Sequence, residues 1–172
     1  MRPDPERIRN LLAYFWTRAF AGEGPDQGRK PQSRSGRGAS RLAPPRVPAQ
    51  LGEIHLVLTD DSGIIRVNQS VFEKSGTTDV ITLAYPALPG QASGRAEIFV
   101  NVEPAMREGA RRVGTACELA LYVAHGCDHL AGGRDETPAR RRRMLGRERR
   151  WVLKAKELGL LAGLCQHFKR GC

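Results

Sequence analysis

Hydrophobic positions recur along this chain with two different periods, and the change between them outlines its elements. From Ile8 to Phe20 apolar side chains recur at the spacing of one helix face, which predicts an amphipathic helix. Three later segments have the alternation or the apolar, β-branched content of strands: 53–59, 77–84 and 95–101. Because a short loop joins the last two strands, we expect them to be antiparallel.

Four further segments have the composition of helices: 64–72, 103–113, 116–131 and 139–158. The third is apolar nearly all round through residues 119–124, which predicts a buried central helix. Thr115 and Glu118 stand three residues apart at its start. This spacing predicts a capping box, in which a hydroxyl and a carboxylate bond the first unpaired backbone N–H groups.

Two segments stand apart from this pattern. Residues 22–50 are rich in Gly, Pro, Ser, Arg and Gln, and they carry too few large apolar side chains to offset the entropy of ordering them. We expect a flexible, basic insertion there, and a loose C-terminal tail over residues 159–172. The 172 residues fit a single domain that is large enough to bury a core.

The candidate chemistry lies at the C-terminal end of the predicted central helix. His125 and His129 are four residues apart, so a helix places both imidazoles on one face. A Gly pair at 132–133 permits a sharp turn, after which Asp135 can fold back toward the histidines. Two imidazoles and a carboxylate leave one position on a metal open for water, as in catalytic zinc sites.

The stretch HGCDHLAGGRD resembles the HGxLHLxGxDH signature of the YbeY family, metal-dependent endoribonucleases that act in rRNA maturation. The resemblance extends over residues 53–158, with several separate motifs in the same order. It implies an α+β fold, in which helices pack a small mixed sheet and the helix with the metal-binding histidines lies in the middle. It also implies that His125 and His129 are metal ligands. Asp135 takes the place of a third ligand, which is usually His, and Glu136 is the alternative carboxylate for that place.

Two further departures from the family pattern bear on the chemistry. Asp128 replaces a usual Leu between the histidines. Phe72 stands where the family usually has an Arg that is thought to hold the substrate phosphate, which bears more on ribonuclease activity than on metal binding. The charge for the phosphate would then come from another arginine, and the candidates are Arg66, Arg95 and Arg134.

A metalloprotease is the rival hydrolase for this histidine spacing. Its HExxH motif needs a Glu as general base directly after the first histidine. Gly126 occupies that place here, so the motif argues against a protease.

Charge favours a nucleic-acid partner. The chain carries 28 Lys and Arg against 18 Asp and Glu, a net charge of +10, and most of its cations are arginines, whose planar fork suits phosphate oxygens. Its four cysteines show no CxxC and no secreted disulfide pattern. The apolar run 119–124 is far too short to span a bilayer, and no signal peptide begins the chain. We therefore expect a soluble, cytoplasmic protein.

Two functional hypotheses follow. The first is a metal-dependent, single-strand-specific endoribonuclease that matures the 3′ end of 16S rRNA, with one Zn²⁺ per chain or another divalent metal such as nickel. The second is a non-catalytic ribosome-assembly factor whose metal is structural, which Phe72 and Asp135 favour. Either protein would work with rRNA and the small ribosomal subunit or its assembly factors, without a membrane. The basic segment 22–50 either contacts rRNA phosphates or is a solubilising linker.

Overall fold

The computed structural model describes residues 2–20, 51–112 and 114–166, and it confirms the α+β fold class. Within these ranges the elements follow in this order: β1 (Arg2–Pro3), α1 (Pro5–Phe20), β2 (Leu51–Thr59), α2 (Asp61–Phe72), β3 (Val80–Tyr85), β4 (Gly94–Asn101), α3 (Val102–Gly109), α4 (Thr115–Leu130), α5 (Pro138–Glu157) and β5 (Cys165–Gln166). The predicted flexible insertion over 22–50 lies outside the described residues.

The main sheet is mixed, as predicted, with the strand order β2-β4-β3. β4 is the central strand, parallel to β2 and antiparallel to β3. Its Ile98 stands opposite Leu56 of β2 and Thr82 of β3, so these three side chains share one face. In the described chain, β3 is therefore an edge strand with β4 as its partner.

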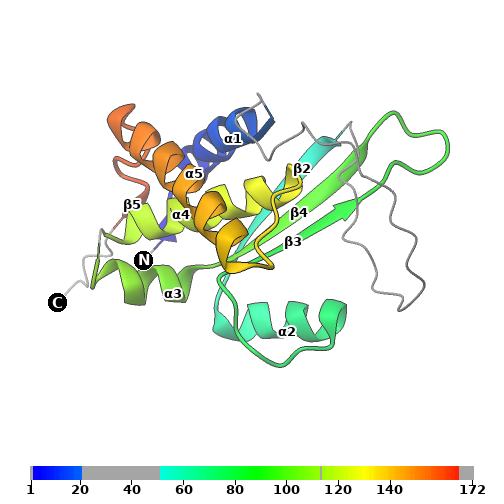
Figure 1. Ribbon diagram of the computed structural model, residues 1–172, viewed down its shortest axis with the longest axis horizontal. Helices are drawn as coiled ribbons and strands as arrows, with labels where there is room; N and C mark the ends of the chain where they lie inside the picture. Colours follow the sequence, from blue (N-terminus) through cyan, green and yellow to red (C-terminus); the bar gives the residue numbers. More distant parts are fainter. Residues whose placement is uncertain (1, 21–50, 113, 167–172) are drawn as a thin grey trace.

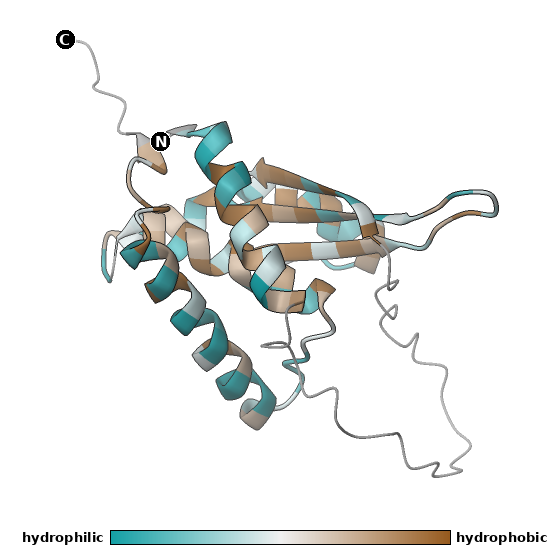
Figure 2. Cartoon of the chain, turned by 90° about the horizontal axis from the view of Figure 1, so that it is seen from above, coloured by the Kyte–Doolittle hydropathy of each residue, from teal (hydrophilic) through white to brown (hydrophobic). Residues whose placement is uncertain are grey.

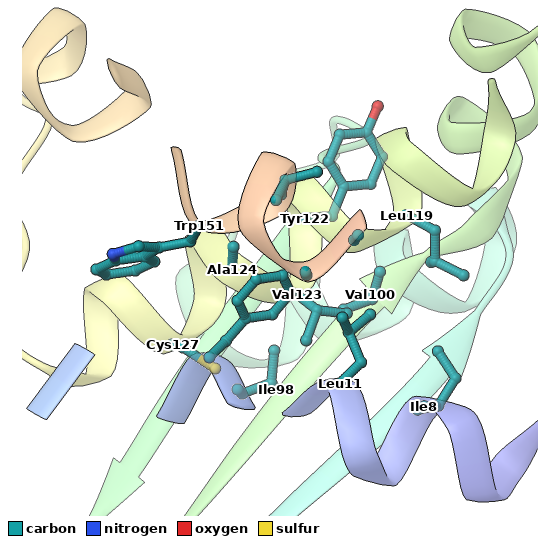
Figure 3. Close-up of a cluster of buried hydrophobic side chains, with 14 of the residues drawn as sticks. Ile8, Leu11, Ile98, Val100, Leu119, Tyr122, Val123, Ala124, Cys127 and Trp151 are labelled. Atoms are coloured by element: carbon teal, nitrogen blue, oxygen red, sulfur yellow. The ribbon is translucent and has the colours of Figure 1, made fainter. Parts of the chain in front are cut away.

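One face of this sheet carries the main hydrophobic core. Ala96, Ile98 and Val100 of β4 point to that face and are fully buried. There α4 crosses β3 and β4, and α1 and α5 pack against α4 (Figures 1 and 3). α2 lies on the other side of the sheet (Figure 1), where Ile64 of α2 and Ile81 of β3 are buried.

α4 is the buried central helix that its composition predicted. Its side chains Val123, Ala124 and Cys127 have no exposed surface and lie among those of α1, α5 and β4 (Figure 3). Gly126 brings the helix close to the sheet, because a Cβ there would stand 2.5 Å from Cγ2 of Ile98. Any side chain at this position would push α4 off the sheet.

The start of α4 differs from the prediction. The N-cap residue is Gly114, at φ 98°, and no side chain caps the helix. The predicted capping box of Thr115 and Glu118 is therefore wrong. The helix begins one residue earlier than predicted, because Gly114, with its positive φ, is the N-cap. Thr115 is therefore the first helical residue and not the cap.

The C-terminal segment is packed as far as Gln166, so the predicted loose tail over 159–172 is wrong for its first half. Leu161 and Leu164 are buried in the main core. β5 pairs antiparallel with β1, and the backbone N–H of Asp4 donates to the carbonyl of Leu164 at 3.1 Å. Residues 167–172 lie outside the described part of the chain.

The outer surface of the helical layer is strongly polar. Figure 2 shows α5 as mostly hydrophilic, and its buried face is made by Met144, Glu148, Trp151, Val152 and Ala155. None of the helices in the described ranges is both long enough and apolar enough to cross a bilayer.

Candidate metal centre

His125 and His129 project from the last turns of α4 with their rings close together. The two Nε2 atoms are 3.1 Å apart, and the rings meet edge to face at 4.4 Å between centroids. The prediction that helical spacing places both imidazoles on one face is confirmed. Both rings are partly buried, so little water competes for the space between them.

A partner holds the other nitrogen of each ring. The Nδ1 atom of His125 lies 2.8 Å from Oε1 of Glu148, a carboxylate with 2% of its side chain exposed. The Nδ1 atom of His129 lies 3.1 Å from the carbonyl oxygen of Gly133. Both partners are acceptors, so each Nδ1 must donate, and each neutral ring then turns its Nε2 lone pair toward the other. Two lone pairs at this distance need a cation between them.

The charge states agree with this arrangement. Burial disfavours the imidazolium of His125, but the hydrogen bond and the charge of Glu148, together with the charges of Asp79 and Asp135, outweigh burial, so the pKa of His125 is raised. The pKa of His129 is lowered, mainly by burial and further by the charge of His125. A proton or a metal ion can supply the cation between the rings.

The turn after α4 is a Schellman motif, and it returns the chain toward the histidines. The N–H of Gly133 donates to the carbonyl of Asp128 at 2.8 Å, and the N–H of Gly132 donates to that of His129 at 2.9 Å. Gly132 adopts φ 91°, which a side chain would oppose. Three residues after Gly132, Asp135 lies beside the histidines.

His125, His129 and Asp135 form one group of potential ligands, whose ligand atoms all lie within 4.8 Å of one another. Ligands at about 2.0–2.1 Å from a tetrahedral zinc stand roughly 3.3 Å apart, close to the separation of the two Nε2 atoms. The carboxylate of Asp135 is also 3.7 Å from Nη2 of Arg141, so a cation at the site would compete with Arg141 for it. The donor set fits a divalent transition metal with one position left open.

Asp128, which replaces the family's usual Leu, is fully buried and paired with Arg147 of α5. Nε and Nη2 of Arg147 reach the two carboxylate oxygens at 2.6–3.0 Å. Burial raises the pKa of Asp128, and the contacts with Arg147 oppose that rise. A Cβ on Gly133 would stand 2.5 Å from Oδ1 of Asp128, so the pair also requires a glycine in the turn. This ion pair joins α4, α5 and the turn directly beside the metal ligands.

A cleft of about 650 Å³ opens beside the metal group. One side, here called the α4 wall, is made by His129, Gly132, Gly133 and Arg134. The other, here called the α2 wall, includes Asn68, Phe72 and Lys74. Residues of the edge strand β3 complete the lining, so an extended molecule could lie along this strand and reach His129.

Only one of the three candidate arginines for phosphate contact lines this cleft. Arg134 does so, on the α4 wall. Arg66 is on α2 beside Ser62, with its Nη1 3.4 Å from Oγ, and is not among the lining residues. Arg95 stacks over the ring of Tyr85 at 4.9 Å and lines a separate pocket. The structure thus brings Arg134 to the cleft and places Arg66 and Arg95 outside it.

Three contributors to the site went unrecognised in the sequence: Lys74, the Asp128–Arg147 pair, and Glu148 as the partner of His125. Lys74 supplies a second cation to the cleft, and the signal for it in the sequence was its place two residues after the 64–72 helix. The Asp128–Arg147 pair had a weaker signal, a charged residue inside an otherwise apolar helix, which usually requires a buried partner.

Comparison with known proteins agrees with this geometry. A sequence model of the family described as Endoribonuclease YbeY matches residues 40–156. The chain is similar to the Endoribonuclease YbeY of Anaeromyxobacter dehalogenans (strain 2CP-C), with 31% identity over 73% of this chain and 65% of that protein. For the same-named protein of Anaeromyxobacter sp. (strain Fw109-5), identity is 31% over 66% of this chain and 63% of that one. The Endoribonuclease YbeY of Elusimicrobium minutum (strain Pei191) is 34% identical over 60% of this chain and 74% of that protein. The match therefore spans slightly less than two thirds of the two Anaeromyxobacter proteins.

Proposed function

Because the chain belongs to the Endoribonuclease YbeY family, we propose that it is a metal-dependent endoribonuclease that cleaves single-stranded RNA. The observation that carries the proposal is the ligand group His125, His129 and Asp135, of which His129 lines an open cleft. Zinc is the proposed metal, one ion per chain, since two imidazoles and a carboxylate suit it.

Each residue of the site has a defined task in such a reaction. A divalent metal, when bound, activates water and neutralises charge on a phosphoryl oxygen. Glu148 and the carbonyl of Gly133 fix the ring orientations and leave both Nε2 atoms available as ligands. Lys74 and Arg134 line the cleft, and their proposed task is to bind phosphates of the RNA strand.

The proposed substrate is rRNA, at the 3′ end of the 16S precursor, and the proposed partners are the small ribosomal subunit or its assembly factors. The charge of +10 supports an RNA partner, because arginines and lysines neutralise phosphates. The proposed place of action is the cytoplasm, where these precursors are processed.

A non-catalytic ribosome-assembly factor with a structural metal is the second candidate, and Phe72 favours it, since it replaces a phosphate-binding Arg. Structural zinc sites, however, usually have four protein ligands, and only three gather here within the described residues. Their position beside a cleft favours the catalytic alternative.

Metal analysis combined with RNA cleavage tests the proposal. The purified protein should contain about one divalent ion per chain. It should cut an unpaired RNA that carries the 16S 3′ sequence, and a chelator should abolish cleavage. The variant with both His125→Ala and His129→Ala should lose metal and activity. His55→Ala is a matched control, because that histidine is exposed on β2 and paired with Glu53.

Two results would contradict the proposal. Metal content that is unchanged in the double variant would show that the ion binds elsewhere. A metal-loaded protein that binds the RNA without cutting it, and that melts at lower temperature after chelation, would identify the metal as structural.

A further inference from the structure

The α2 wall of the cleft presents an exposed aromatic ring. Phe72 is the last residue of α2, and 47% of its surface is exposed. It lines the same cleft as His129, from the opposite side. An aromatic ring beside a ligand-binding cleft offers a flat apolar face that is available for stacking.

The ring stands on a well-fixed support. After Phe72 the chain makes a left-handed turn at Glu73, whose N–H donates to the carbonyl of Gln69 at 3.1 Å. The side-chain amide of Asn68 donates to the carbonyl of Gly76 at 2.7 Å and closes the loop that follows. The end of α2 is thus held in place, so the backbone that carries the ring is fixed beside the cleft.

Positive charges accompany the ring on both walls. Lys74 stands two residues after Phe72, and Arg134 faces the cleft from the α4 wall. Aromatic rings combined with cations are the recognition chemistry of single-stranded nucleic acids, in which bases stack and phosphates bind the cations. The bases of a duplex are already paired and stacked, so they offer no free face.

We propose that Phe72 is a stacking platform for one unpaired base of the RNA strand that occupies the cleft, with Lys74 and Arg134 binding the phosphates on either side of that base. This inference rests on the proposed function and adds the residue that selects unpaired RNA. It also explains how the cleft can hold its substrate although the usual Arg is replaced: stacking takes over part of the binding that a charge would provide.

A double-mutant cycle that combines protein variants with RNA variants tests this directly. The ligand is a labelled, unpaired RNA of about ten nucleotides, together with a set of the same RNA in which one nucleotide at a time is abasic. Affinity is read by fluorescence anisotropy before cleavage proceeds. Phe72→Leu keeps an apolar side chain but removes the ring, and it should weaken binding of the intact RNA roughly tenfold. Phe72→Tyr should preserve binding.

The abasic series identifies the partner base. At one position the loss of the base should weaken binding by the wild-type protein but not by Phe72→Leu, because the two changes remove the same contact. Phe72→Leu should leave affinity for a duplex unchanged. Phe20→Leu is the matched control, since Phe20 is 45% exposed on α1 and lies outside the cleft lining. On a cleavable RNA, Phe72→Leu should raise KM and leave kcat nearly unchanged.

Additive effects at every abasic position would overturn the inference, and so would equal losses in Phe72→Leu and Phe20→Leu. The inference is also overturned if an extended peptide displaces RNA from the wild-type protein but not from Phe72→Leu. The ring would then belong to a binding site for protein. The outcomes separate from those of the proposed function. If the protein fails to cleave RNA but the cycle shows coupling, the platform stands and the nuclease proposal fails. If the protein cleaves RNA but the cycle shows no coupling, the nuclease proposal stands and the stacking platform fails.

Discussion

The two walls of the cleft are built in opposite ways. On and behind the α4 wall, the polar groups are held by buried partners: Glu148 behind His125, and Arg147 on Asp128. On the α2 wall, Phe72 and the cation of Lys74 are exposed. The side that would carry the chemistry is fixed in several directions, while the side that would carry recognition is open to water.

This difference indicates which changes each wall can tolerate. Metal ligands must be positioned to a fraction of an ångström, which requires locked rotamers and satisfied hydrogen bonds. Base stacking accepts any base and needs only an accessible ring. We therefore expect substitutions of the metal ligands and of the partners behind the α4 wall to disturb folding or metal binding. Substitutions at the exposed Phe72, Lys74 and Arg134 should instead change RNA affinity.

The largest effect is expected from breaking the ion pair behind the α4 wall. Asp128→Ala leaves Arg147 largely buried without its carboxylate, which should lower the free energy of unfolding by about 3–5 kcal/mol. Chemical denaturation measures this change. In the variant with both Asp128→Leu and Arg147→Met, no charge remains unpaired, so most of the stability should return. If the double variant is no more stable than Asp128→Ala, the loss does not come from an unpaired charge.

Removal of the third ligand should come next. Asp135→Asn keeps the size of the side chain but removes its charge, and it should lower metal affinity by more than about 100-fold, since outer partners alone account for 10–100-fold. Asp135→His, which restores the family's usual ligand, should retain the metal. Competition with a chromogenic chelator measures both affinities. Glu136→Gln is the neighbouring control, and a larger loss there would identify Glu136 as the ligand instead.

A smaller effect on the metal is expected from the carboxylate behind His125. Glu148→Gln keeps an acceptor for Nδ1 but removes the negative charge, so metal affinity should fall by about 10–100-fold. Isothermal titration with zinc is the measurement, and circular dichroism should show an unchanged fold. An unaltered affinity would mean that Glu148 only supports packing.

On the α2 wall, we expect Phe72→Arg to change the salt dependence of RNA affinity more than the affinity itself. One additional phosphate contact should steepen the fall of log affinity with log salt concentration by roughly 0.7 for a single strand. Anisotropy titrations at several salt concentrations give this slope. An identical slope in the two proteins would show that position 72 does not face the RNA backbone.

The smallest effect is expected at the end of α2. Glu73 is the one non-glycine residue with positive φ in the described chain, at 57°. Glu73→Gly should relieve this strain and raise the free energy of unfolding by up to about 1 kcal/mol. Thermal unfolding measures it, with the metal content held constant. A loss of stability would show that the Glu73 side chain makes a compensating contact.

The parts of the site that the sequence predicted are local ones. His125, His129 and Asp135 lie within eleven positions, and helix periodicity together with a glycine turn determines how such a segment folds. The partners behind them were not predicted. The carboxylate on His125 comes from 23 residues away and the guanidinium on Asp128 from 19 residues away, and no local period links such positions.

The same distinction applies to the fold. Strand alternation and helix faces predicted the order of the main elements, because each of these patterns is local to its own segment. The mixed sheet was implied by the family resemblance, since strand pairing joins segments far apart in the chain. The capping box failed because the φ of Gly114 moved the helix start by one residue. The packed segment after α5 was missed because Leu161 and Leu164 fill a gap beside α1 that only the assembled core creates.

The packed segment after α5 also determines when the fold can form fully during synthesis. α1 packs into a core that includes Leu164, and β1 has its partner strand in β5. A ribosome makes the chain from the N-terminus, so α1 emerges first but must wait for more than 140 residues before its final contacts exist. α4 and α5 can cover part of its apolar face earlier, but its contacts with the segment after α5 and the pairing of β1 with β5 form last. Truncation after α5 should therefore leave β1 without its partner strand and uncover part of the apolar face of α1, while the packing of α1 against α4 remains.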